Sequence, residues 1–147
     1  MVLLMNYKKA LQLFLLLIAA YDIYLGVLGL FFRGDAVAHA ANFFNFNLEV
    51  NSSTFWLIGL FSTYLIAFAG FLIVAATDPV KYIKIIYISI GIFVVRIVQR
   101  FQFMSIAVTQ PDLAVNSNKS GFYLFTIIAT AVVLSFLTFK VKSNKSK

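Results

Sequence analysis

The sequence contains no cysteine and few charged residues. Without cysteine the chain can form no disulfide, no thiolate metal site and no cysteine nucleophile. Only 12% of its 147 residues are Asp, Glu, Lys or Arg. Its single histidine, His39, cannot build a multi-histidine metal site within one copy of the chain. These absences exclude several classes of enzyme but leave the cellular compartment open.

Negative charge is scarcer still. Five acidic residues face twelve basic ones, which gives a net charge of +7. The basic residues lie between and beyond apolar segments rather than along one soluble face, so nucleic acid is not the expected partner. Membrane orientation explains their positions better.

Apolar residues, in contrast, make up 62% of the chain, including 17 Phe, 7 Tyr and one Trp. A soluble domain of this length carries far less, so the excess apolar surface must face lipid. The expected class is an all-α integral membrane protein, a single domain over 1–147 that contacts the lipid bilayer. Four apolar segments predict a bundle of four transmembrane helices, at about 10–32, 55–77, 82–103 and 121–139.

The first segment has a second interpretation. Lys8 and Lys9 precede an apolar run that reaches Ala19 and Ala20, as in a secretory signal peptide. The apolar stretch continues well past Ala20, which favours a spanning helix.

Local signals define several predicted helix ends. Pro79 disfavours helix at Asp78 and so ends the second segment. Ser120 is the expected N-cap of the fourth segment. The basic tail 140–147 is expected to be a disordered strip near anionic lipid.

The distribution of Lys and Arg predicts the orientation. One side holds Lys8, Lys9, Lys81, Lys84, Lys140, Lys142, Lys145 and Lys147, whereas the other holds only Arg33 and Lys119. By the positive-inside rule both termini and the turn between the second and third segments are cytoplasmic.

Two outer loops, about 33–54 and 104–120, are long for so small a protein and are expected to contain structure. In the first, Asp35 can cap a short interfacial helix over Ala36 to Phe46. His39, Phe43 and Phe46 would share one face of it.

Asp22 is the first candidate for a functional residue, because an ionisable group inside a spanning helix is costly. Segments one and three run in the same direction, and Asp22 and Arg96 fall at similar depths along them. Arg100, Gln99 and Tyr24 could join them. Three interpretations stay open: an ion pair that only fixes helix packing, an outward-facing pocket for a ligand, substrate head group or proton path, and a protonated Asp22 without a pair.

His39 is the second candidate. A lone histidine on an interfacial helix is usually a surface or packing residue. The alternative is a ligand to haem, chlorophyll or a metal shared with another subunit. The small neighbours Ala36, Ala38, Ala40 and Ala41 would let a flat ring approach.

Small residues lie within three of the segments and would let helices approach closely, by packing inside the bundle. They are Gly26, Gly29, Ala67, Gly70, Ser89 and Gly91.

The layout resembles the loose group of small four-helix bacterial membrane proteins called DoxX-like or BphX-like. Four features carry the resemblance: a first helix ending in Leu30-Phe31-Phe32-Arg33, an interfacial helix after it, a tight Asp78-Pro79-Val80-Lys81 turn, and late arginines, Arg96 and Arg100, in the third helix. The resemblance covers nearly the whole chain and implies a bacterial inner-membrane location. Some members accompany oxidoreductases, so it implies an accessory role and carries over no functional residue.

No catalytic motif is found: there is no phosphate-binding glycine loop, no HExxH and no GxSxG. The leading hypothesis is therefore a non-catalytic accessory or structural subunit of a larger membrane complex, with other membrane subunits or further copies of the chain as partners. Haem, chlorophyll or quinone would enter only through a partner. The alternative is a small-molecule-binding protein or transporter with an outward-facing pocket around Asp22 and Arg96.

Overall fold

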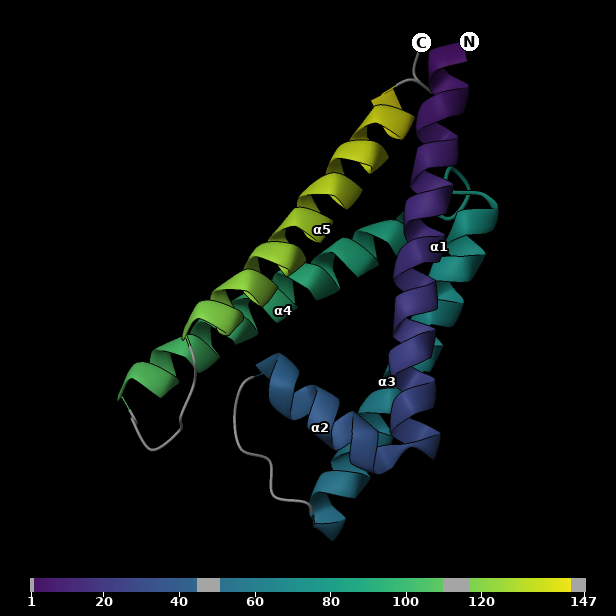
Figure 1. The fold of residues 1–147 in the computed structure, drawn as a ribbon. Helices are drawn as coiled ribbons and strands as arrows, with labels where there is room; N and C mark the ends of the chain where they lie inside the picture. Colours follow the sequence, from purple (N-terminus) through teal and green to yellow (C-terminus); the bar gives the residue numbers. More distant parts are fainter. Residues whose placement is uncertain (1, 45–50, 110–116, 144–147) are drawn as a thin grey trace.

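The computed structural model describes residues 2–44, 51–109 and 117–143, and these fold into helices joined by short connections. The helices are α1 (Val2–Phe31), α2 (Arg33–Phe44), α3 (Ser52–Thr77), α4 (Ile83–Thr109) and α5 (Ser117–Ser143). Both chain ends lie at the same end of the molecule, and α2 lies at the other (Figure 1). The all-α prediction is confirmed.

Within the described ranges, three helices are long and apolar enough to cross a membrane. They are Asn6–Phe31 in α1, Ser52–Thr77 in α3 and Gly121–Ser143 in α5. This supports a multi-pass helical membrane protein. The fourth long helix, α4, is not one of the three and carries Lys84, Arg96 and Arg100 along its length.

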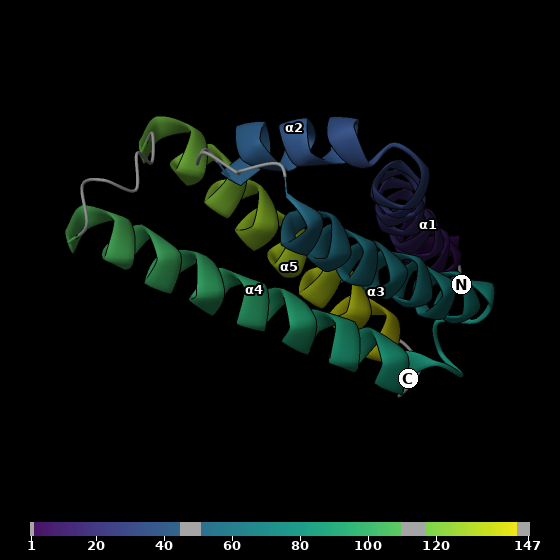
Figure 2. The ribbon, with the colours of Figure 1, turned by 90° about the horizontal axis from the view of Figure 1, so that it is seen from below.

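The principal packing is between α1 and α3, which run antiparallel, side by side (Figures 1 and 2). Leu11, Leu15 and Ala19 repeat every four residues and are fully buried against α3. Further along α1, Gly26 and Gly29 let the two backbones approach. A Cβ at Gly26 would lie 3.1 Å from the Ser62 carbonyl oxygen, so no larger residue fits without a shift.

The second pair is α4 with α5, which lies at an angle to the first (Figure 1). The two pairs meet in one core near the end that holds the termini. Its members from α4 and α5 are Ile86, Phe93, Ala131, Leu134 and Val141. Toward the other end the pairs diverge (Figure 1).

The short helix α2 lies across that open end and contacts α1, α3 and α5. Ala36 and Val37 are its buried residues. A helix was predicted here, but Asp35 does not cap it. Only Phe32 separates the end of α1 from the start of α2 at Arg33, and Asp35 lies in the first turn of α2. A carboxylate is favourable there because the helix dipole is positive at that end. The side chain of Phe43 and the whole of Phe46 lie outside the described residues.

The beginning and end of α3 follow from local chemistry. It ends at Thr77 before Asp78 and Pro79, as predicted. It begins at Ser52, three residues earlier than predicted, because Asn51 is an N-cap: the Thr54 N–H donates to Asn51 Oδ1 at 2.9 Å.

Both α4 and α5 are longer than predicted. α4 continues to Thr109, and α5 begins at Ser117, so Ser120 lies inside the helix rather than at its N-cap. The prediction of a disordered tail was wrong for its first half, because α5 continues through Lys140 and Lys142 to Ser143. Val141 is 2% exposed, and the two lysines suit a helix C-terminus. Residues 144–147 lie outside the described part.

The end with the termini is also the basic end. The Lys8 ammonium lies 3.1 Å from Asp78 Oδ1, which joins the start of α1 to the turn between α3 and α4. Gln12 Nε2 donates to the Ala76 carbonyl at 2.9 Å and so satisfies a terminal carbonyl of α3. Lys142 from α5 lies 5.8 Å from the centre of the Tyr87 ring of α4.

Candidate functional site

Asp22 lies on the inner side of α1 and is only 2% exposed. Asp22 lies on the same face of α1 as Leu15 and Ala19, so it continues the buried face of this helix toward Gly26. Within the described residues, no hydrogen-bond donor contacts its Oδ2 atom. A buried carboxylate oxygen without a donor is costly, so this position has a structural or functional reason.

Arg96 on α4 is the charged group that acts on this carboxylate through space. The contacts that the structure defines for its guanidinium are with aromatic rings instead. The guanidinium carbon lies 5.7, 5.6 and 5.5 Å from the ring centres of Tyr64, Phe68 and Phe93. The predicted ion pair with Asp22 stays a prediction.

The three rings form a cluster between α3 and α4. Tyr64 and Phe68 are one turn apart on α3 and stack at 6.0 Å, and Phe93 meets Phe68 edge-on at 6.4 Å. Arg96 Nη2 also lies 3.5 Å from the Tyr64 hydroxyl, the outer limit of a hydrogen bond. Each cation–π contact contributes about 0.5–2 kcal/mol, depending on how dry the site is.

Sequence reasoning missed these aromatic partners. The only signal was the spacing of Tyr64 and Phe68 by four residues and of Phe93 and Arg96 by three. Neither spacing reveals that α3 and α4 bring the two pairs together.

Arg96 also lines a groove of about 510 Å³ on the outer face of α3 and α4. Gln99, which is exposed, lies one turn further along its edge. The rest of the lining is apolar apart from Tyr64: Phe61, Ile88, Gly91, Ile92 and Val95. Two of the predicted site residues therefore share one groove, and they are its strongest polar groups.

Arg100 and Tyr24 lie elsewhere. Arg100 is 5% exposed, and Tyr123 on α5 acts on it electrostatically. Tyr123 also acts electrostatically on Tyr21 of α1. Tyr123 was not among the predicted site residues. Tyr24 is 56% exposed and takes no part in the groove.

His39 is exposed on α2. Across residues 2–44, 51–109 and 117–143, no three His, Asp or Glu side chains gather to hold a metal ion. Its role as a ligand to a ring or metal shared with another subunit stays a prediction.

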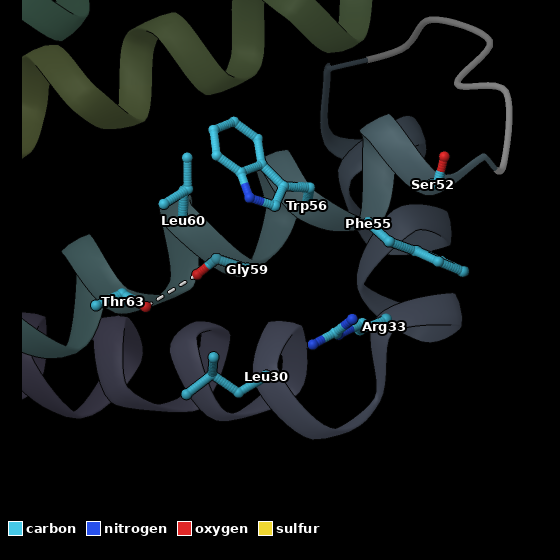
Figure 3. A pocket seen from close by; sticks show the side chains of 8 residues that line it. All are labelled: Leu30, Arg33, Ser52, Phe55, Trp56, Gly59, Leu60 and Thr63. Carbon is cyan, nitrogen blue, oxygen red and sulfur yellow. Dashed lines mark hydrogen bonds between the residues drawn. The ribbon is translucent and has the colours of Figure 1, made fainter.

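A second groove, of about 470 Å³, lies where α1 gives way to α2 and α3 begins (Figure 3). Among the described residues that line it, Arg33 is the only charged one, and Ser52 and Thr63 carry hydroxyl groups. Its apolar lining comes from Leu30, Phe55, Trp56, Gly59 and Leu60.

No protein-family model matches the chain, and neither a curated protein nor a solved structure matches it. The resemblance to the DoxX-like group therefore stays a prediction.

Proposed function

We propose that the chain is a four-helix membrane protein that acts as a non-catalytic accessory subunit of a larger membrane complex. The fourth span would be α4. Its 27 residues extend for about 40 Å, beyond the roughly 30 Å of a bilayer core.

The positions of the α4 arginines support this assignment. Arg100 is buried, and Arg96 is half-buried with its guanidinium beside aromatic rings, so protein covers part of their charge. Charged residues inside membrane helices are tolerated in such surroundings. Lys84 lies at the end of α4 that also holds the Lys8–Asp78 ion pair. By the positive-inside rule that end is cytoplasmic, together with both termini.

The observation that carries the subunit function is the groove between α3 and α4. Arg96 and exposed Gln99 line it, although the other large exposed side chains of α3 and α4 are mostly apolar. Lipid tails cannot satisfy a guanidinium or an amide. A partner helix with a hydrogen-bond acceptor or a carboxylate can satisfy both, and exposed Gly91 would allow it to approach closely.

Gly91 also provides the test, with Gly70 as its control. Nothing lies within 4 Å of a Cβ built at either glycine, so leucine should fit at both without disturbing the fold. Of these two glycines, Gly91 lines the groove and Gly70 does not. The tagged full-length protein is extracted gently from its own membranes, and co-purifying proteins are identified by mass spectrometry.

We expect stoichiometric partner subunits with the wild type and with Gly70→Leu, and their loss with Gly91→Leu. A wild-type protein that purifies alone, or only with further copies of itself, contradicts the accessory-subunit function. Any haem, chlorophyll or quinone should co-purify only when the partner does.

A second candidate function is a small-molecule-binding protein or transporter. The observation in its favour is the environment of Asp22. This residue is buried, one of its carboxylate oxygens has no hydrogen-bond donor among the described residues, and Arg96 acts on it electrostatically. In this case the same extraction should yield the protein with one defined small molecule. Asp22→Asn should release that molecule, whereas Gly91→Leu should leave Asp22 and the bound molecule undisturbed.

A further inference from the structure

The groove near Arg33 has the length and the polarity of a lipid site. Arg33 follows the α1 span directly, and Ser52 begins the α3 span, so its mouth lies at the depth of lipid head groups. From Ser52 the lining continues along α3 to Thr63, about 16 Å further, which is about half of the roughly 30 Å core. The groove thus extends through one leaflet.

In the described part of the lining, charge is confined to the mouth of this groove. The Arg33 side chain extends into the space between α1 and α3, on the side where Leu30 and Gly59 lie (Figure 3). No ion pair is defined for Arg33 among the described residues. Below it the lining is apolar apart from Thr63, whose hydroxyl donates to the Gly59 carbonyl at 3.0 Å and so is already satisfied.

We propose that this groove binds one phospholipid with an anionic head group. Arg33 would pair with the phosphate, as a guanidinium does when it offers two parallel N–H donors. Ser52 lines the same groove, and an acyl chain would lie along Leu30, Gly59 and Leu60.

Gly59 makes room for that chain. Nothing lies within 4 Å of a Cβ built at Gly59, so the space that a larger side chain would fill is open to an acyl chain. Trp56, which is 65% exposed, borders the groove near its mouth, at the depth where tryptophan is enriched in membrane proteins.

Trp56 also supplies the measurement, because it is the only tryptophan in the chain. The full-length protein is reconstituted into phosphatidylcholine vesicles that contain a fixed fraction of phosphatidylglycerol or phosphatidylcholine with brominated acyl chains. Bromine quenches tryptophan fluorescence on contact, so the quenching reports which lipid occupies the groove.

We expect brominated phosphatidylglycerol to occupy the site about fivefold better than brominated phosphatidylcholine, as one interfacial arginine would provide. Arg33→Gln should abolish this preference, and Lys81→Gln at the opposite end should retain it. Gly59→Leu should reduce quenching by both lipids, whereas Gly70→Leu should not.

Equal quenching by the two lipids, or a preference that survives Arg33→Gln, overturns the proposal. So does fluorescence that neither lipid quenches, since a protein helix would then cover the groove. None of these results depends on a partner binding at Gly91, so the outcome is independent of the subunit function.

Discussion

The Lys8 ammonium lies 3.1 Å from the Asp78 carboxylate, and this ion pair holds the start of α1 against the turn after α3. A hydrogen bond from Lys8 is the largest effect on Asp78, and it lowers the pKa of that carboxyl below its ordinary value of 3.8. Because the pKa is lowered in the folded state, the pair stabilises the fold above pH 3.8 and is lost as pH falls below it. Both side chains are about 40% exposed, so salt should weaken the effect.

Thermal unfolding of the detergent-solubilised protein between pH 2 and pH 6 measures this contribution to stability. The change should fall within about one pH unit of the ordinary carboxyl pKa and below it. Asp78→Asn and Lys8→Met should each flatten the acid limb of the stability curve. If Lys8→Met leaves the limb unchanged, the lysine is not responsible for the lowered pKa.

The Gly29 position should tolerate no larger residue. A Cβ there would collide with the Ser62 hydroxyl, which donates to the Ile58 carbonyl at 2.6 Å. We expect Gly29→Val to lower the free energy of unfolding by about 1–3 kcal/mol, the usual cost of overpacking. Gly70→Val is the control, since open space surrounds it. Equal losses at both positions would mean that α1 and α3 are not in close contact at Gly29.

The rings around Arg96 should contribute through their faces rather than through the tyrosine hydroxyl. Tyr64→Leu removes a cation–π contact, and we expect a loss of about 0.5–1 kcal/mol. Tyr64→Phe keeps the ring and removes only the hydroxyl, at 3.5 Å from Arg96, so it should cost little. Thermal denaturation in one detergent compares the two. A larger loss with phenylalanine than with leucine would show that the hydroxyl is the important group.

Asp22 and Arg96 should be energetically coupled if they form the predicted pair. We expect the losses in unfolding free energy of Asp22→Asn and Arg96→Gln, added together, to exceed the loss of the double variant. The difference is the coupling energy, which we expect to be about 0.5–3 kcal/mol. Chemical unfolding of the four proteins in mixed micelles gives the cycle. Losses that simply add would exclude a direct interaction and leave the aromatic rings as the main neighbours of Arg96.

The sequence predicted the helices well because their signals are local. The apolar runs indicated the spans in α1, α3 and α5, and Asp78-Pro79 marked the end of α3 correctly. One of the ends that were missed depends on distant contacts. The helix α5 continues through Lys140 because Val141 packs into the core, which no local pattern reveals.

The candidate site was predictable only in part, for the same reason. Arg96 and Gln99 stand out in the sequence as polar residues in an apolar segment, and they do share a groove. Tyr64 and Phe68 look like ordinary membrane aromatics until α3 and α4 are brought together. The prediction of small residues at helix contacts holds for Gly26, Gly29 and buried Ser89, whereas Ala67, Gly70 and Gly91 are exposed.

The pairing of α1 with α3 has a consequence for biogenesis. During synthesis α1 enters the bilayer with buried Asp22 and its glycine face before α3, its main partner, has left the ribosome, and α4, which carries Arg96, follows later still. Until then a carboxylate and a close-packing surface lack their final neighbours. We therefore expect the first helix to become stable in the bilayer only once α3 has inserted beside it.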